Sequence, residues 1–334
     1  MNSKVSSMLL VLWLLLTVPF SNAMAADVSE RYLMSHVRFL TCEALQGRRA
    51  AGAGDRITEA YIRAEYERSG ILPLPSLGDY RQEFTALETT LDKDSTHLLI
   101  THGEQSSRYQ IGRDVFYLVN RHSEVSVDAP LVFAGFGITA PEYDYDDYGG
   151  IDVEGKIVLV LNNEPGSQTD NDKFRGRAPT RHSFAASKER TAREHGAVGV
   201  IIVTDAAAGQ PDIDVTMPRR YRRELEQPFF GVRQQAEEIP VLYATRRLVA
   251  DLLDITHIDL IDMQKRIDAS MTPASTAFAA VRAAIHIRLA KVEEKTAANI
   301  VGYLEGSDEA LREEFIVISA HHDHLGALAD GTVF

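Results

Sequence analysis

The chain has 334 residues, of which 45% are hydrophobic and 25% charged, as in an ordinary globular protein large enough for two domains. Its formal net charge of −13 argues against nucleic acid as a main partner. Cys42 is the only cysteine, which excludes a disulfide within the chain, and we expect it to be a small core residue of a helix rather than a nucleophile.

The N-terminal 25 residues are organised like a secretory signal peptide. Lys4 supplies the positive start, Met8–Phe20 is apolar, and Ala23–Ala25 has the small residues of a cleavage site. The apolar run is shorter than the roughly 20 residues that cross a bilayer. We therefore expect cleavage before Ala26, a periplasmic or secreted location and no stable membrane anchor; an uncleaved anchor is the alternative.

Two helices separated by a glycine-rich loop are expected next. Asp27 and Glu30 form a capping box, and apolar residues then recur at helical spacing as far as Ala44. The loop Gly47–Gly54 lacks the Gly-Lys-Ser/Thr of a phosphate-binding loop. The second helix is predicted over Asp55–Arg68, with Ile57, Tyr61 and Ala64 on its apolar face.

The middle of the chain predicts a self-contained α/β module over residues 115–255. Apolar strands are expected at Pro130–Ala134, Lys156–Leu161 and Val198–Val203, with a helix over Ala185–His195 before the last of them. The last two strands and the helix form one βαβ unit, whose strands are parallel.

Three features inside this module have alternative interpretations. Tyr143–Tyr148 alternates aromatic and acidic residues, but it lacks the glycine and distal glutamate of an EF-hand, so a solvated structural loop is favoured over a calcium site. His182 and His195 have no ligand spacing and are expected to be structural or on the surface. Ile239–Tyr243 is predicted as an edge strand, because Pro240 lacks a backbone donor.

After the module, the pattern predicts a linker at Met271–Thr276 and three further strands. In Ile285–Leu289 apolar residues alternate with polar ones, which indicates a half-buried strand with His286 facing outward. Asn299–Leu304 is the next strand, and Phe315–Ala320 is a buried one. The flanks, residues 27–85 and 278–334, are expected to form one other domain that the module interrupts.

The buried strand leads directly into His321, His322, Asp323 and His324, which include three of the 11 histidines of the chain. Parallel sheets present ligand-binding groups at the carboxyl ends of their strands. One imidazole can bind a metal ion there while the aspartate orients it. An exposed polar loop with chance histidines is the alternative.

Asn299–Asp308 and Phe315–Gly326 resemble the N-V-x-G-x-L-x-G-S-D…A-H-x-D-H-x-G signature of secreted two-zinc aminopeptidases. These enzymes belong to metallopeptidase family 28, which also contains glutamate carboxypeptidase II and the transferrin receptor ectodomain. Leu45–Arg48 is similar to the first segment of the family. Three further segments resemble the protease-associated (PA) domain that is inserted in members of the family: Leu131–Ile138, Asp146–Tyr148 and Gly155–Val158.

The resemblance implies an α/β fold, in which a zinc-aminopeptidase-type mixed sheet with helices on both faces, incomplete here, is interrupted by a PA domain. The division it implies is a signal peptide (1–25), the N-terminal part of the peptidase domain (26–114), the PA domain (115–255) and the start of the main peptidase sheet (278–334).

For the site, the resemblance implies that His321 binds zinc and that Asp323 orients it as the catalytic partner. The complete family site holds two Zn²⁺ ions. His322 stands where the family often has an aromatic residue.

The function implied is a zinc-dependent exopeptidase, an aminopeptidase that removes N-terminal residues from peptides, represented by its N-terminal portion. The bridging aspartate of the family, in D-N-x-S-G, its glutamate pair and its last two ligands do not occur before Phe334, so we expect a fragment or a truncated relative. The alternatives are a catalytically inactive binding relative and a metallo-β-lactamase-type hydrolase, whose motif has histidine where Ser319 stands here. The preferred side chain of the substrate stays open.

Overall fold

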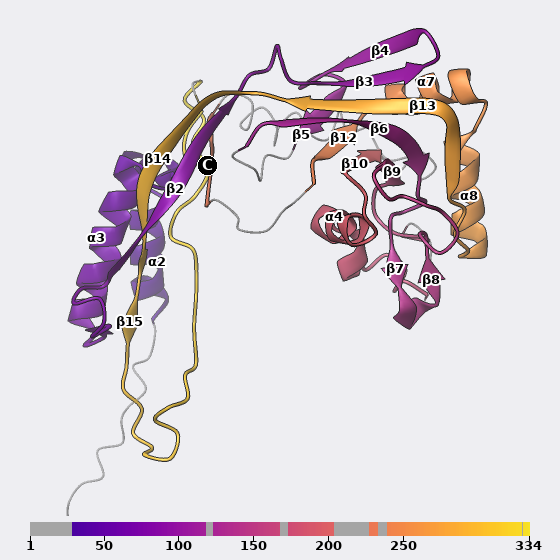
Figure 1. Ribbon diagram of the computed structural model, residues 1–334. Coiled ribbons are helices and arrows are strands. Elements are labelled where there is room, and N and C mark those ends of the chain that lie inside the picture. The colour runs from indigo at the N-terminus through magenta and orange to yellow at the C-terminus, as the bar shows by residue number, and fades with distance from the viewer. Residues whose placement is uncertain (1–28, 118–122, 168–172, 204–226, 233–238, 329) are drawn as a thin grey trace, which may run out of the picture.

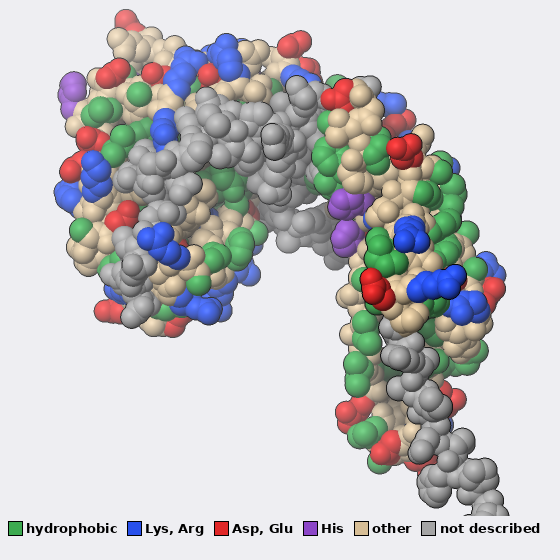
Figure 2. Space-filling view, turned by 180° about the vertical axis from the view of Figure 1, so that it is seen from behind, with side chains coloured by type: hydrophobic (Ala, Val, Ile, Leu, Met, Phe, Trp, Pro, Cys, Tyr) green, Lys and Arg blue, Asp and Glu red, His purple; other side chains and the backbone are tan. Residues whose placement is uncertain are grey.

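The computed structural model describes residues 29–117, 123–167, 173–203, 227–232, 239–328 and 330–334, so the expected signal peptide lies outside the described residues. Two bodies are joined by long strands: a smaller body with helices and a larger one built on a sheet (Figure 1). Acidic, basic and hydrophobic side chains are intermixed on the face of the larger body in Figure 2. Within the described part, no helix is long and apolar enough to cross a membrane.

The smaller body contains α2 (Glu30–Leu40), the 3-10 helix η1 (Glu43–Arg48) and α3 (Ala53–Arg68). Ser29 caps α2, because its side-chain oxygen accepts a hydrogen bond from Tyr32 N at 3.2 Å. Phe39 of α2 stacks on Tyr61 of α3, with ring centroids 4.2 Å apart. Since α2 ends at Leu40, Cys42 is a half-buried residue before η1; the prediction that it lies in the core of a helix was wrong.

Long antiparallel strands connect the two bodies. β2 (Arg81–Leu91) pairs with β14 (Leu289–Ile300), and β11 (Phe229–Gly231) lies on the other edge of β2. Beyond β14, β15 (Gly302–Tyr303) pairs with β1 (Leu72–Pro73). The strand predicted at Asn299–Leu304 is therefore divided between the end of β14 and β15.

The larger body is an eight-stranded mixed sheet in the order β4-β3-β13-β6-β9-β10-β12-β5. β6, β9, β10 and β12 are parallel, and antiparallel strands lie on either side of them. The predicted βαβ unit is confirmed, since α4 (Ala185–Glu194) connects β9 to β10. The bounds of the eight strands are β3 His97–His102, β4 Gln105–Gln110, β5 Val115–Tyr117, β6 Val125–Phe133, β9 Ile157–Leu161, β10 Gly199–Val203, β12 Val241–Ala244 and β13 Thr276–Ile287.

Both faces of this sheet are covered. Leu159 and Ile201 belong to the larger apolar cluster, together with residues of α7 (Arg246–Thr256) and α8 (Leu260–Ser270). Val158 and Val200 belong to a second cluster on the side of α4. Every residue of β9 and β10 is buried, which explains why their sequences are continuous apolar runs rather than alternating ones.

The sheet reaches beyond the range expected for the inserted module. β3 and β4 precede residue 115, and β13, at the start of the range 278–334, pairs with β3 and β6 rather than with β14. Ile285 and Ile287 are buried there, and His286 is half-buried beside His97. The strand predicted at Ile285–Leu289 is thus divided between the end of β13 and the start of β14, because alternation does not specify which sheet a residue joins.

Buried polar side chains hold two parts of the module in place, the acidic turn and the 3-10 helix that contains His182. The acidic turn comprises β7 (Thr139–Ala140), η2 (Pro141–Tyr143) and β8 (Tyr145–Asp146). It is structural, as expected, and solvated in part: Asp144 and Asp146 are exposed, whereas buried Asp147 accepts hydrogen bonds from Phe136 N, Ile138 N and the hydroxyl of Tyr145. His182, in η3 (Arg181–Ser183), is buried with its Nε2 3.0 Å from Glu142.

Two predicted strands differ from the structure. β12 lies between β10 and β5 and is not an edge strand; Pro240 precedes it and accepts a hydrogen bond from Val200 N at 2.8 Å. Phe315–Ala320 forms no strand, and Phe315 to Ile318 are 80–94% exposed in the long irregular segment after β15 (Figure 1). An apolar run needs a neighbouring strand for its backbone groups, and no described strand pairs with this one.

Candidate functional site

The segment that carries the histidine motif is docked on the loop before α3. His324 N donates to Arg48 O at 2.8 Å, and Gly326 N donates to Gly47 O at 2.9 Å. The guanidinium of Arg48 donates through Nε to the backbone oxygen of His322 at 2.9 Å. Residues 322–326 and 47–48, far apart in sequence, are thereby fixed side by side.

Glycines make this approach possible. Gly47 and Gly326 have φ values of +68° and +81°, in the left-handed region that favours glycine. A Cβ on Gly326 would lie 2.9 Å from the Cβ of Arg49, and a Cβ on Gly47 would collide with the backbone of Gly326. The glycine-rich loop is therefore a docking surface for the motif segment.

The structure brings together the two predicted site residues, His321 and Asp323, but leaves them exposed. His321 Nδ1 lies 2.7 Å from the backbone oxygen of Asp323 and 3.6 Å from its Oδ1. The two side chains are 73% and 45% exposed. His321 belongs to no described group of three potential ligands, so the described residues do not fit the implied zinc pair, and the roles of both residues stay predictions.

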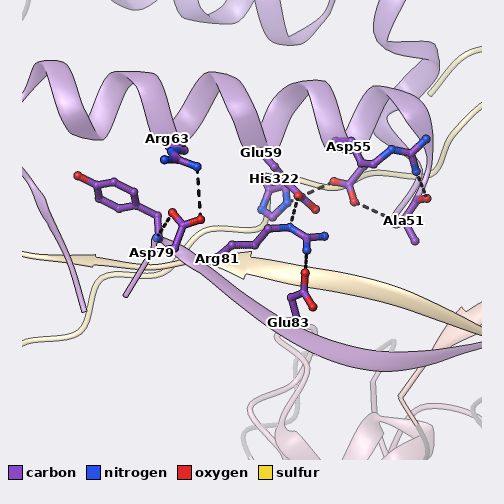
Figure 3. Close-up of polar contacts among 10 residues, drawn as sticks. Ala51, Asp55, Glu59, Arg63, Asp79, Arg81, Glu83 and His322 are labelled. Atoms are coloured by element: carbon purple, nitrogen blue, oxygen red, sulfur yellow. Dashed lines mark hydrogen bonds and ion pairs between the residues drawn. The ribbon is translucent and has the colours of Figure 1, made fainter. Parts of the chain in front are cut away.

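A second cluster lies beneath α3, where His322 faces Asp55 and Glu59 (Figure 3). Asp55 and Glu59 are four residues apart, so both project from the same face of the helix. His322 Nε2 is 3.2 Å from Asp55 Oδ1, and one ligand atom from each of the three residues lies within 4.8 Å of the others. Asp55 and Glu59 are buried and His322 is half-buried.

Each carboxylate of this cluster uses one oxygen and keeps the other free of hydrogen bonds. Asp55 Oδ2 accepts from Ala51 N at 2.8 Å, and Glu59 Oε2 accepts from Arg81 Nε at 2.9 Å. Asp55 Oδ1, Glu59 Oε1 and His322 Nε2 are buried without a hydrogen-bond partner, although the first and last are at ion-pair distance. The contact with Asp55 raises the pKa of His322, against the effect of burial.

This cluster was not predicted from the sequence, because the face of α3 that was expected to be buried is not the one that faces the interior. Ile57 is 48% exposed, whereas Asp55, Thr58 and Glu59 are buried. Asp55 and Glu59 at helical spacing, directly after a glycine loop, were the available signal. Hydrophobic periodicity does not detect a buried face of this kind, because its residues are polar.

Comparisons with known proteins agree with part of this description. Residues 127–252 match the PA domain family, which confirms the PA domain that the resemblance predicted. No curated protein matches the chain.

Among solved structures, an aminopeptidase from Aneurinibacillus sp. strain AM-1 is 17% identical, with a TM-score of 0.40, and the match covers 82% of this chain and 49% of the aminopeptidase. BSAP, a zinc aminopeptidase from Bacillus subtilis, is 13% identical, with a TM-score of 0.28 and coverage of 81% and 46%. The chain thus spans about half the length of these structures.

Proposed function

We propose that this chain is the N-terminal portion of an exported zinc-dependent exopeptidase of the aminopeptidase type, which acts on peptides. One observation carries the proposal: the motif segment is docked, by backbone hydrogen bonds, on the loop that contains Leu45–Arg48. These two segments resemble the same peptidase family independently of each other. The match of residues 127–252 to the PA domain supports the same family architecture.

In this proposal His321 is a zinc ligand and Asp323 holds its ring. A zinc ion held there would lower the pKa of a bound water and polarise the scissile carbonyl. Catalytic zinc typically takes three protein ligands and a water molecule, so His321 needs further ligands from outside the described residues. The role of this chain is then to position His321 through the docked motif segment, and the general base lies elsewhere.

Export is the second element of the proposal. The signal-peptide pattern over residues 1–25 supports a periplasmic or secreted location, where free peptides would be the substrates. An N-terminal sequence determined on protein from the periplasm or medium should begin at Ala26. Protein that still begins at Met1 in that fraction would contradict export with cleavage.

The second candidate function is a binding protein without catalysis. It is favoured by the exposure of His321, 73%, and by the absence of a ligand set around it in the described part of the chain. The PA domain would then serve as an interaction surface.

The experiment that separates the two begins with the source gene, read for an in-frame D-N-x-S-G and a glutamate pair. The complete gene product should hydrolyse a leucine chromogenic amide, and His321→Ala should lower kcat/KM at least about 100-fold, as expected for a lost metal ligand. The control His102→Gln, in β3 of the sheet, should keep full activity. A product that folds but never hydrolyses the amide supports the binding protein.

A further inference from the structure

The cluster beneath α3 contains more unpaired polar atoms than an ion pair can satisfy. An ion pair between His322 and Asp55 accounts for Nε2 and Oδ1, which are 3.2 Å apart. Glu59 Oε1 then remains without a hydrogen-bond partner, on a residue that is 6% exposed. A buried carboxylate oxygen without a partner is unfavourable, so this atom needs an explanation.

We propose that Asp55, Glu59 and His322 form a divalent transition-metal site, with Zn²⁺ as the preferred class of ion. The site is separate from His321, and the proposal does not depend on the peptidase activity.

The two carboxylates are each oriented by a hydrogen bond to the oxygen that the ion would not use. The hydrogen bond from Ala51 N holds Asp55 Oδ2, and Arg81 Nε holds Glu59 Oε2, so Asp55 Oδ1 and Glu59 Oε1 are left for the ion (Figure 3). Such outer contacts fix the orientation of metal-binding carboxylates. Arg81 also pairs with Glu83, so these two charges offset each other, and an ion of charge +2 would balance the −2 of Asp55 and Glu59.

The donor set selects the class of ion. One imidazole nitrogen and two carboxylate oxygens suit zinc and neighbouring transition metals, whereas calcium and magnesium take oxygen ligands. Three protein ligands leave a position for water. Because Asp55 and Glu59 are on α3 and His322 is on the motif segment, the ion would link residues near the two ends of the described chain.

Zinc binding by the purified chain tests this directly. After treatment with a chelator, the chain is titrated with zinc by calorimetry, and X-ray absorption at the zinc edge identifies the ligands. We expect one equivalent of zinc, coordinated by one imidazole nitrogen and oxygens. His322→Ala and Glu59→Gln should each weaken the affinity at least about tenfold.

Two matched variants serve as controls. His102→Gln changes a histidine of β3, in the sheet, and Glu83→Gln changes the other carboxylate that pairs with Arg81. Both should keep the zinc affinity of the parent chain. Circular dichroism verifies folding, and Glu59→Gln, which conserves shape, decides the matter if His322→Ala unfolds the segment.

Two results would overturn the proposal. Zinc that is lost in His321→Ala but kept in Glu59→Gln would place the ion on the motif histidine instead. A chain that binds no stoichiometric zinc would show that the cluster is an ion pair only. Neither result bears on the activity of the complete gene product, so this proposal and the proposed function fail separately.

Discussion

Two apolar runs in this chain, Ile157–Leu161 and Phe315–Ile318, have similar sequences and opposite surroundings. The first is strand β9, buried at every position between β6 and β10. The second forms no strand and is 80–94% exposed. Apolar composition indicates that a segment gains from burial, but a strand forms only where neighbouring strands satisfy its backbone groups.

The difference in burial gives the largest expected effect. Ile157→Ala removes a fully buried side chain and should lower the free energy of unfolding by about 2–5 kcal/mol. Ile316→Ala, at a side chain that is 94% exposed, should change it by less than about 0.5 kcal/mol. Urea unfolding of the two variants measures both values. An equal loss in Ile316→Ala would show that the second run is buried in solution.

The larger body buries a lysine as well as apolar side chains, so its stability should depend on pH. Lys188 of α4 is fully buried and donates to Phe136 O at 2.5 Å and Asn163 O at 2.6 Å. Burial lowers the pKa of Lys188 from 10.5 to about 7. Between these values the unfolded chain binds a proton that the folded chain does not, so stability should rise as the pH increases from 7 to 10.

Lys188→Met tests that slope. The melting temperature of the parent chain should rise more between pH 7 and pH 9 than that of Lys188→Met, by the equivalent of about 1–2 kcal/mol. Burial also raises the pKa of Asp147 to about 7, which acts in the opposite direction below pH 7, so the comparison is confined to higher pH. Lys265→Met, at an exposed lysine of α8, is the control. Parallel curves for the parent chain and Lys188→Met would contradict the assignment.

The elements that could be predicted from the sequence are those fixed by local pattern. β9, α4 and β10 follow from continuous apolar runs around a helical segment, and the PA domain follows from the short motifs at Leu131–Ile138, Asp146–Tyr148 and Gly155–Val158. The partners of β13 could not be predicted, because alternation is the same in either sheet.

At the candidate site, His321 and Asp323 were identified from a motif, whereas Asp55 and Glu59 were not. Carboxylates that face the interior have no hydrophobic signature, and their partner His322 is distant in the sequence. Phe315–Ala320 was predicted as a strand because sequence alone does not show whether a neighbouring strand exists.

The smallest effect concerns the docked motif segment, where two glycines with nearly the same φ can be compared. Gly326 and Gly331 have φ values of +81° and +84°, so alanine is strained at both. A Cβ meets Arg49 only at Gly326, since nothing lies within 4 Å at Gly331. Comparing the effects of Gly326→Ala and Gly331→Ala therefore separates the effect of the contact with Arg49 from that of the backbone strain. We expect Gly326→Ala to accelerate hydrogen exchange of the His324 amide, which donates to Arg48 O, about tenfold more than Gly331→Ala does. Equal exchange rates of the His324 amide in the two variants would mean that the motif segment is held on the loop without the close approach of Gly326 to Arg49.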